Sequence, residues 1–421
     1  MNEREALTAF FDEFNPERDN LNEFRERYLE NFISAPVKRS FYSSVTGIIR
    51  NLILLEYIME IPLKKGQKLS KNSRSIMLCA LYDIFFNVKP HHVVNEWVEL
   101  SRIKKDKGFL NFMLREILRQ TDGKIENCEL PKNKIREMAT RYSFPIDFTV
   151  ALSEEMNKSK TEELFITLNA ETPSVFMENR FKKEMCPLKG KEVYPGIFEI
   201  EEHEQARKAA ANGLIVIFEK TSLLPVLLLD PQKNERILDL CSAPGNKAFM
   251  IYSACGGKID ITVNEPESRR FEQLKKNIEN WEIKVSGAFS VDGRTFASHM
   301  PFDAVFIDAP CSNSGVISKR PDVKYKLKAG GISKLQRLQV DLILNAERLI
   351  KKEGRIIYAV CSFLKEEIKD VIAEVENRSS LFADNANIPA QLEKFREDNY
   401  LRIIPNAEFP VGFSMAVFRR R

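Results

Sequence analysis

Residues 237–247 read Ile-Leu-Asp-Leu-Cys-Ser-Ala-Pro-Gly-Asn-Lys, an apolar strand that runs into a tight glycine turn. A helix is predicted directly after it, from about Ala248 to Cys255. A strand, a glycine turn and a helix N-terminus open a nucleotide-binding α/β unit, in which backbone N–H groups face the ligand. The turn lacks the three-glycine fingerprint of dinucleotide sites, so it argues only weakly for NAD. The stretch therefore predicts an α/β domain with a nucleotide-type ligand at this turn.

Acidic residues stand at the ends of the two strands predicted next. Glu265 follows the strand 258–263, and Asp292 follows the strand 285–291. An acid about 20 residues after the glycine turn accepts hydrogen bonds from ribose hydroxyls in nucleotide-binding sheets. Each acid alone is also an ordinary turn or helix-cap residue. Their repetition at successive strand ends favours a ligand site.

Two cysteines end the next two apolar strands. The strand 302–308 is followed by Ala-Pro and Cys311, and the strand 355–360 is followed by Cys361. Open α/β sheets bind ligands at the carboxyl ends of their strands, where a thiolate can attack an electron-poor ring carbon. This chemistry suits a pyrimidine, whose C5 becomes nucleophilic only after a group adds to C6. A single strand-end cysteine would more simply be a small buried hydrophobe.

Together these motifs resemble the RNA cytosine-5 methyltransferases, which use S-adenosylmethionine. The resemblance covers about residues 165–421 and follows the family's order through 239–247, Glu265 with Arg270, 292–294, 308–311, 320–322, 361–362 and 412–413. It implies an α/β fold, a Rossmann-like class I methyltransferase core with a mostly parallel sheet. The last strands, near 401–404 and 414–418, would pair antiparallel at the sheet edge. The two-cysteine pattern is typical of the RNA enzymes, because related DNA enzymes carry their nucleophile on the Pro-Cys strand instead.

The resemblance also implies the site residues. Cys361 would be the nucleophile, Cys311 would assist its release, and Asp308 would contact N3 and N4 of the base. S-adenosylmethionine would lie against Cys241, Ser242, Ala243, Pro244, Gly245, Asn246, Lys247, Glu265, Arg270, Asp292 and Asp308. The substrate would be a single-stranded or flipped cytosine.

Several positions depart from the family's pattern, namely Phe218, Asn246, Ala248, Val360, Ile368 and Val411. Asn246 stands at the second glycine of the turn, where asparagine tolerates a left-handed backbone better than most residues. The departures put rate and substrate in doubt more than the chemistry.

The first third of the chain is predicted to be helical. Apolar residues recur at three- and four-residue spacing over 39–60, and helical patterns continue over 75–88, 92–100 and 108–118. Residues 94–100 and 108–115 resemble the helical RNA-binding domain of the NusB antitermination factor. Fused to a methyltransferase, that domain implies the bacterial Sun-type class, which modifies small-subunit (16S) ribosomal RNA. Without the enzyme downstream, a generic helical bundle would be the preferred interpretation.

Three domains are expected: a helical RNA-binding domain over 1–145, a small α+β subdomain over 146–230 that helps clamp RNA, and a catalytic domain over 231–421. In the second, the alternation over 164–169 predicts a strand, and 189–200 holds further strand-like residues. The basic run after Cys311 is expected to contact RNA through Lys319, Arg320 and Lys324. A solvated surface is the plainer interpretation of any such run.

Composition is that of a globular protein. The chain has 421 residues, of which 43% are hydrophobic and 29% charged, and its formal net charge of +4 does not by itself reveal a nucleic-acid binder. Seven scattered cysteines fit a reducing compartment, and four histidines without zinc spacing predict no metal. No signal peptide or membrane span is expected, so we expect a cytoplasmic protein. We also expect a monomer. Two alternatives stay open: a non-catalytic RNA-binding relative, and a methyltransferase for tRNA or large-subunit rRNA.

Overall fold

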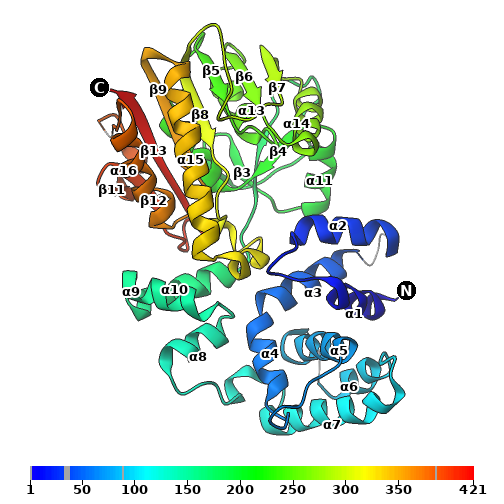
Figure 1. The fold of residues 1–421 in the computed structure, drawn as a ribbon. Coiled ribbons are helices and arrows are strands. Elements are labelled where there is room, and N and C mark those ends of the chain that lie inside the picture. Colours follow the sequence, from blue (N-terminus) through cyan, green and yellow to red (C-terminus); the bar gives the residue numbers. More distant parts are fainter. Residues whose placement is uncertain (1, 33–37, 88–89, 385) are drawn as a thin grey trace. The chain divides into compact units, whose positions relative to one another are not determined.

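The computed structural model describes residues 2–32, 38–87, 90–384 and 386–421, and it divides into two compact units (Figure 1). The helical unit comprises Met1–Ala170 together with Lys319–Leu327. The sheet unit comprises Glu171–Ser318 and Lys328–Arg421. Within the described residues, no helix combines the length and the apolar character that a membrane crossing requires.

Amphipathic helices build the helical unit around one apolar core. They are α1 (Glu3–Glu13), α2 (Leu21–Phe32), α3 (Lys38–Arg50), α4 (Leu52–Glu60), α5 (Lys71–Tyr82), α6 (Pro90–Val98), α7 (Lys104–Thr121), α8 (Lys134–Arg141), α9 (Ile146–Met156) and α10 (Lys158–Asn169). The helix predicted over 39–60 is interrupted at Asn51, whose φ of −113° and ψ of 17° leave helical geometry. The helix predicted over 75–88 continues beyond α5 as one π-helical turn, and Val88 lies outside the described residues.

The strand predicted over 164–169 is wrong, because this stretch forms the last part of α10. Leu164, Phe165 and Leu168 are its buried side chains, and this spacing gives one face of a helix. Asn157 caps the helix by accepting a hydrogen bond from the Lys160 N–H at 3.1 Å. Six residues are too few to separate the two periodicities by pattern alone.

A segment from much later in the chain completes the helical unit. It contains the 3-10 helix η6 (Pro321–Lys326), in which Asp322, Lys324 and Tyr325 are buried. The Tyr325 hydroxyl donates a hydrogen bond to the Ile49 carbonyl at 2.7 Å, at the end of α3. The helical unit therefore extends to residue 170, beyond the expected boundary at 145, and includes a piece of the expected catalytic domain.

The sheet unit is built on a nine-stranded mixed sheet, with strand order β11-β12-β13-β9-β8-β5-β6-β7 and with β10 paired to β13. The strands are β5 (Arg236–Asp239), β6 (Asp260–Asn264), β7 (Gly287–Phe289), β8 (Phe302–Asp308), β9 (Ile350–Val360), β10 (Leu381–Ala383), β11 (Arg396–Glu397), β12 (Tyr400–Ile403) and β13 (Phe413–Arg420). The strands β5 to β9 pair in parallel, and β13 runs antiparallel to β9 and β12. The predicted α/β class is confirmed. The C-terminal strands pair antiparallel as predicted, but β13 lies inside the sheet and not at its edge.

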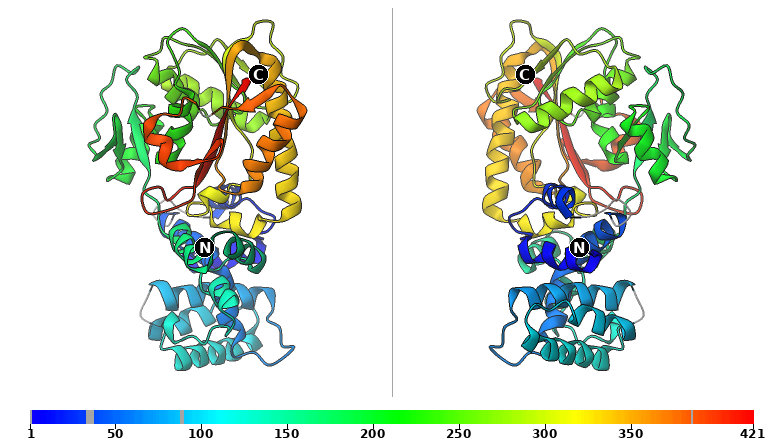
Figure 2. Two further views of the ribbon diagram at one scale, coloured as in Figure 1. Left: turned by 90° about the vertical axis from the view of Figure 1, so that its left-hand side faces the viewer. Right: turned by 90° about the vertical axis from the view of Figure 1, so that its right-hand side faces the viewer.

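Side chains of the central strands alternate between two apolar cores, as the period of two requires. In β8, Ala304 and Phe306 belong to one core, and Val305 and Ile307 belong to the other. The first core also holds residues of α12 (Leu224–Leu229), α13 (Asn246–Ala254) and α14 (Ser268–Trp281). The second holds residues of α15 (Ala329–Leu349) and α16 (Lys369–Arg378). Helices therefore cover both faces of the sheet (Figure 2).

A four-stranded antiparallel sheet precedes this core in the chain. Its strands are β1 (Val175–Glu178), β2 (Glu192–Tyr194), β3 (Ile197–Glu199) and β4 (Ile215–Phe218), in the order β2-β3-β1-β4, and α11 (His203–Ala211) connects the last two in sequence. The strand-like stretch 189–200 thus contains β2 and β3. The last residue of β4 is Phe218, which lines the pocket described below.

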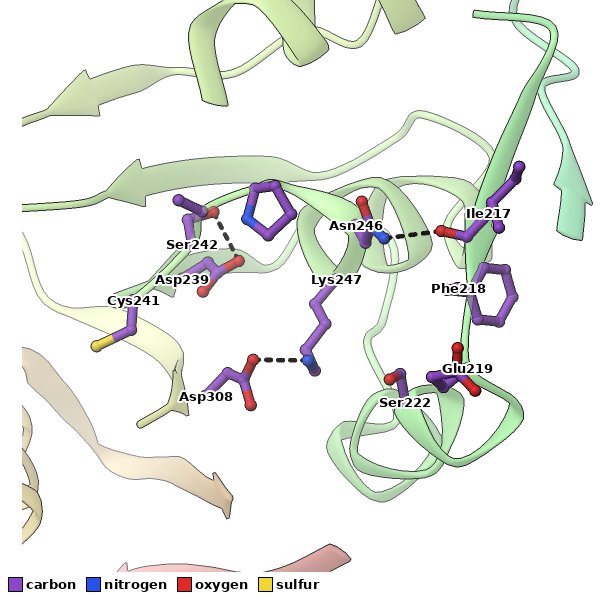
Figure 3. A pocket seen from close by; sticks show the side chains of 12 residues that line it. Ile217, Phe218, Glu219, Ser222, Asp239, Cys241, Ser242, Asn246, Lys247 and Asp308 are labelled. Carbon is purple, nitrogen blue, oxygen red and sulfur yellow. Dashed lines mark hydrogen bonds and ion pairs between the residues drawn. The ribbon is translucent and has the colours of Figure 1, made fainter. Parts of the chain in front are cut away.

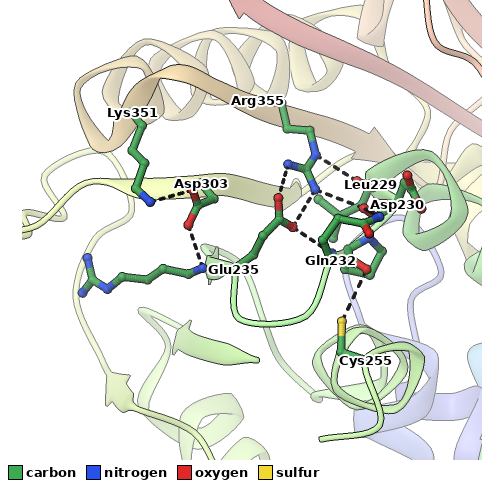
Figure 4. A network of polar contacts seen from close by, with 10 residues as sticks. Leu229, Asp230, Gln232, Glu235, Cys255, Asp303, Lys351 and Arg355 are labelled. Atoms are coloured by element: carbon green, nitrogen blue, oxygen red, sulfur yellow. Dashed lines mark hydrogen bonds and ion pairs between the residues drawn. The ribbon is translucent and has the colours of Figure 1, made fainter. Parts of the chain in front are cut away.

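Ion pairs link the parallel strands near their amino ends (Figure 4). The Arg355 guanidinium donates to both carboxylate oxygens of Glu235 at 2.8 Å, and Lys351 pairs with Asp303 at 2.6 Å. Arg355 also donates to the Leu229 carbonyl at 2.9 Å. Because β5, β8 and β9 are parallel, their carboxyl ends meet at the opposite edge of the sheet.

Candidate functional site

The carboxyl ends of β5 and β8 border a pocket of about 280 Å³ (Figure 3). Asp239 ends β5, Asp308 ends β8, and Lys247 reaches toward Asp308 from the first turn of α13. The pocket is lined by Ile217, Phe218, Glu219, Ser222, Asp239, Cys241, Ser242, Ala243, Pro244, Asn246, Lys247 and Asp308. The structure therefore brings together six residues of the predicted turn, all but Gly245, with the predicted Asp308.

The glycine turn depends on Gly245 and not on Asn246. Gly245 has a φ of 106°, the left-handed region that side chains disfavour, and it is the N-cap of α13. Asn246 is the first residue of the helix, so its tolerance of a left-handed backbone is not used. Its side-chain amide instead donates to the Ile217 carbonyl at 3.0 Å, which ties the turn to β4.

Lys247 and Asp308 form an ion pair inside the pocket, with 2.6 Å between Nζ and Oδ2. Burial alone would lower the pKa of Lys247, but the neighbouring Asp308 carboxylate more than offsets this and the pKa is raised. A negative charge on Cys361 also raises the pKa of Lys247. The pocket thus holds a firmly protonated ammonium group paired with a carboxylate.

Asp239 is a buried acid that the sequence prediction did not single out. Its Oδ2 accepts a hydrogen bond from the Ser242 hydroxyl at 2.7 Å, whereas its Oδ1 is buried without a hydrogen-bond partner. Burial raises the pKa of Asp239 to about 7, and the charge of Asp308 contributes in the same direction. An unpaired buried carboxylate oxygen in a pocket indicates a place for a hydrogen-bond donor on a ligand.

We expect Asp239 to make the sheet unit less stable as the pH rises from about 4 to about 7. The unfolded chain releases this proton near the ordinary carboxyl pKa, whereas the folded chain keeps it up to about pH 7. The free energy of unfolding should therefore fall by at most about 1.4 kcal/mol per pH unit in this window. Thermal unfolding of Asp239→Asn and of the unsubstituted protein should show a difference that grows in favour of the variant from pH 5 to pH 7. A difference that stays constant with pH would contradict the raised pKa.

Glu265 and Arg270 brace the glycine turn from behind. Glu265 follows β6, its side chain is 2% exposed, and it accepts hydrogen bonds from the backbone N–H groups of Ala243 and Glu267. Arg270 donates to the Ala243 carbonyl at 2.9 Å and lies 3.4 Å from the Glu265 carboxylate. Burial raises the pKa of Glu265, although Arg270 acts in the opposite direction. Both predicted residues therefore contact the turn, although neither lines the pocket of Figure 3.

Asp292 follows β7, and Arg294 engages its carboxylate. The Arg294 guanidinium donates to both oxygens, at 3.0 Å from Nε to Oδ1 and 2.5 Å from Nη2 to Oδ2. These hydrogen bonds lower the pKa of Asp292, so its charge is secure at neutral pH. Asp292 does not line the pocket of Figure 3.

The two predicted cysteines lie side by side, with 3.0 Å between their Sγ atoms. Cys361 also contacts the Asn313 side-chain oxygen at 3.1 Å. The hydrogen bond to Cys361, followed by burial and by the negative charges of Cys361 and Glu367, raises the pKa of Cys311 well above its usual range. Cys311 therefore favours its protonated form.

Three loops lock together around the thiols. The Gly315 N–H donates to the Cys361 carbonyl at 3.0 Å, and the Gly412 N–H donates to the Gly315 carbonyl at 2.9 Å. A Cβ on Gly315 would lie 2.0 Å from the Gly412 carbonyl oxygen, so a larger residue cannot fit there. The Ser314 and Ser362 hydroxyls add a buried hydrogen bond of 2.9 Å. Gly412 of the predicted motif thus helps to fix the position of Cys361 through Gly315.

The structure contradicts one of the three predicted RNA contacts. Lys324 is fully buried inside the helical unit, where Nζ donates to the Arg50 carbonyl at 2.6 Å, so it cannot reach a phosphate group. Arg320 lies 3.7 Å from the buried Asp322 carboxylate, and Lys319 is half-buried. This basic run packs into the helical unit, and we withdraw Lys324 as an RNA contact.

The positions that depart from the family's pattern are mostly buried and apolar. Val360, Ile368 and Val411 are 0%, 0% and 2% exposed, and Phe218 borders the pocket. Glu219 and Ser222 also line it, and the sequence prediction missed both, because β4 and the short helix η4 (Lys220–Leu223) carry no motif. Asp239 could have been found, since it is an acid at a strand end like Asp308. Among the described residues, no group of three or more His, Cys, Asp or Glu side chains is placed to hold a metal ion.

Comparison with known proteins gives two family matches. Residues 226–419 match the family described as 16S rRNA methyltransferase RsmB/F, and residues 1–119 match the NusB family. A curated relative from Bacillus subtilis (strain 168), called probable ribosomal RNA small subunit methyltransferase B, is 25% identical over 403 residues, which cover 90% of this chain and 89% of the relative.

Two solved structures share the fold. The crystal structure of PH0851 has a TM-score of 0.76 at 20% identity and covers 100% of this chain and 99% of that one. A methyltransferase homolog protein from Pyrococcus horikoshii has a TM-score of 0.57 at 20% identity and covers 69% of this chain and 100% of that one. At these identities the likeness shows the fold alone.

Proposed function

We infer the function of this chain from its family: residues 226–419 belong to the RsmB/F family of 16S rRNA methyltransferases, and residues 1–119 belong to the NusB family. The chain is accordingly an rRNA methyltransferase. We propose that it methylates C5 of a cytosine in 16S rRNA, through a covalent bond between the Cys361 sulfur and C6 of the base. The observation that carries this proposal is the pair of strand-end thiols, 3.0 Å apart, at the sheet edge where Asp308 and Lys247 line a pocket.

The residues around the glycine turn fit S-adenosylmethionine as the cofactor. The unpaired Oδ1 of Asp239 offers an acceptor to an amino or hydroxyl donor of the ligand. We propose that the cofactor lies against the turn Cys241–Lys247, with Glu265, Arg270 and Asp292 on its nucleoside side and Asp308 near its reactive end. When bound, it supplies an electrophilic methyl group to C5 of the base.

Cys361 acts first in the proposed reaction. Its thiolate adds to C6, a new sulfur–carbon bond forms, and the electrons of the C5=C6 bond make C5 nucleophilic. Asp308 contacts the base at ring N3 and at the exocyclic N4 amino group: its carboxylate accepts a hydrogen bond from N4 and holds a proton taken up at N3, which neutralises the negative charge that the thiolate pushes into the ring. The Lys247 ammonium group stabilises the negative charges of Asp308 and of the Cys361 thiolate. After methylation a base or water takes the C5 proton, the electrons of that C–H bond restore the C5=C6 double bond, and the sulfur–carbon bond breaks so that Cys361 leaves as a thiolate. Cys311 assists this release.

The base must leave its stack before both ring faces are accessible, so a single-stranded or flipped cytosine is the proposed substrate. We propose that the NusB-like region positions the RNA, with Lys319 and Arg320 as candidate contacts. We also propose that the chain acts as a monomer in the cytoplasm.

Bisulfite sequencing tests the proposed function. RNA from cells with and without this gene should differ at one or a few cytosines of 16S rRNA. A difference confined to tRNA or large-subunit rRNA would assign the chain to another substrate. No difference anywhere, together with no methyl transfer by the purified protein, would make it a non-catalytic RNA-binding relative.

We expect Glu265→Ala to weaken S-adenosylmethionine binding by roughly 1–3 kcal/mol, the scale for leaving buried polar groups unpaired. The substitution removes the acceptor of the Ala243 and Glu267 N–H groups and leaves Arg270 without its carboxylate partner. Isothermal titration calorimetry measures the change. The matched control is Glu267→Ala, an exposed acid two residues away, which should leave the affinity unchanged. An unchanged affinity for Glu265→Ala would contradict the assignment.

A further inference from the structure

The proposed mechanism requires the two thiols to play different parts, although their sulfur atoms are only 3.0 Å apart. One must attack as a thiolate, while the other keeps its proton during the attack. The strands themselves do not distinguish them, because β8 and β9 are parallel neighbours that both end at the site. The difference has to come from the groups that surround each sulfur atom.

A buried carboxylate lies on the Cys311 side of the pair. Glu367 is 0% exposed and ends the short 3-10 helix η7 (Lys365–Glu367), which follows the Cys361 loop. Its Oε1 accepts a hydrogen bond from the Ser312 N–H at 2.8 Å, and its Oε2 accepts one from the Ser312 hydroxyl at 2.5 Å. Ser312 is the residue after Cys311, so the two hydrogen bonds of Glu367 fix the turn that carries this thiol.

Two further buried side chains, Gln339 and Tyr358, extend this hydrogen-bond network. The Gln339 side-chain amide donates to the Glu367 carboxylate at 3.0 Å and to the Pro310 carbonyl at 2.9 Å. The Tyr358 hydroxyl lies 3.0 Å from the Gln339 side-chain oxygen and 2.5 Å from the Glu367 carbonyl. The backbone on both sides of Cys311 is thereby fixed by one buried network that spans α15, β9 and η7.

The partners of the Glu367 carboxylate are neutral donors. Among the described residues, no lysine or arginine forms an ion pair with it. A buried charge without a cation is costly, and a chain that needed only hydrogen bonds here could use glutamine. We therefore expect the negative charge of Glu367 to fulfil a role that a neutral glutamine would not.

We propose that Glu367 is a positioning residue that tells the two thiols apart: it holds the Pro310–Ser312 turn against Cys361, and its negative charge keeps the proton of the pair on Cys311. Cys361 is then left to attack the base. This inference rests on the proposed function, because only a two-thiol reaction needs the distinction.

The electrostatic surroundings of the pair agree with this assignment. The ionisable groups that act on Cys311 are Cys361 at the end of β9 and Glu367 on η7, and both raise its pKa. Cys311 in turn contributes to the raised pKa of Tyr358 on β9. On the opposite side, the Lys247 ammonium group of α13 interacts with a negative Cys361, and Asp308 of β8 pairs with that ammonium group. The negative group thus lies toward Cys311, and the positive group interacts with Cys361.

Thiol alkylation in the absence of RNA tests the proposal. Glu367→Gln keeps the shape and can keep every hydrogen bond, since its amide can donate to the Ser312 hydroxyl, but it removes the charge. Labelling with iodoacetamide, read at each cysteine by mass spectrometry across a pH series, should show Cys311 reacting about tenfold faster at pH 8 in the variant, the scale of one unit charge at short range. The matched control is Glu366→Gln, an exposed neighbour, which should leave the rate unchanged.

An unchanged Cys311 rate in folded Glu367→Gln overturns the proposal. The buried Cys255 reports folding, because it should stay unlabelled in a folded protein. The unsubstituted protein gives a second measurement that does not depend on the variant: the pH midpoint for labelling Cys311 should lie above that for Cys361, and equal or reversed midpoints overturn the proposal. If the labelling behaves as expected but no RNA adduct ever forms, the proposed function fails while the role of Glu367 stands. If RNA adducts form but the labelling of Cys311 is the same in Glu367→Gln, the role of Glu367 fails while the proposed function stands.

Discussion

Cys361→Ala should lose methyl transfer and covalent RNA capture altogether, whereas Cys311→Ala should capture RNA and stall. If Cys361 forms the bond to C6, its removal leaves no nucleophile and no route to an activated C5. If Cys311 serves only the release step, its removal still allows attack and methylation. With only 3.0 Å between their sulfur atoms, the two thiols could both reach one bound base, as the proposed mechanism requires.

Denaturing electrophoresis distinguishes the two variants. Cys311→Ala incubated with S-adenosylmethionine and rRNA should give a slowly migrating band that disappears on RNase treatment, and Cys361→Ala should give none. Cys255→Ala, which replaces a cysteine at the far end of α13, is the control and should behave like the unsubstituted protein. An adduct in Cys361→Ala instead would place the nucleophile on the Pro-Cys strand, as in the DNA enzymes. Full activity in both variants would overturn the two-thiol mechanism.

The parts of the site that could be predicted from the sequence are those that lie within single strand–turn units. Residues 241–247, Asp308 and Cys361 each lie at or just after the end of an apolar strand, and parallel strands bring their carboxyl ends to one edge. Local sequence order is therefore enough to place them together. The α/β class follows from the same alternation of strands and helices.

The residues that could not be predicted reach the site through long-range packing. Glu219 and Ser222 enter the pocket because β4 lies beside the glycine turn, where Asn246 donates a hydrogen bond to the Ile217 carbonyl. Nothing in their own sequence marks them. Glu367 is similar, because its partner Ser312 is distant in the chain and the two meet only when β8 and β9 pair.

Charge patterns were the least informative part of the sequence. A basic run reads the same whether it lies on the surface or inside a domain. Lys324 looked like an RNA contact, but its ammonium group lies among the ends of three helices. It is 2.6 Å from the Arg50 carbonyl of α3, 3.4 Å from the Tyr142 carbonyl after α8, and 3.3 Å from the Asn169 side-chain oxygen of α10. Only the folded helical unit brings these oxygens together.

Lys324→Met should destabilise the helical unit by about 1–3 kcal/mol, the scale for leaving buried hydrogen-bonding groups without a partner while the side-chain volume is kept. The substitution leaves the Arg50 carbonyl and the Asn169 side-chain oxygen without this donor, whereas the Tyr142 carbonyl still accepts a hydrogen bond from the Asn169 amide at 2.8 Å. It also removes the contact between Nζ and the Phe144 ring, whose centroid is 4.5 Å away. Burial, followed by the charge of Arg50, lowers the pKa of Lys324 well below its usual range, so the lost hydrogen bonds and packing carry the expected effect.

Urea unfolding followed by tryptophan fluorescence measures the change in the free energy of unfolding of the helical unit. The chain has two tryptophans, of which Trp97 lies in α6 and Trp281 in α14, so a Trp281→Phe background reports the helical unit alone. Lys134→Met, an exposed lysine of α8 in the same unit, is the matched control and should change stability by less than about 0.5 kcal/mol. A loss of stability no larger than that of the control would mean that Lys319–Leu327 contributes little to the stability of the helical unit. The expected loss would mean that a fragment ending at 145 or 170 lacks part of its own core. Deleting the helical region would then expose buried groups of this segment, so its contribution to RNA binding has to be tested by substitutions in the intact chain.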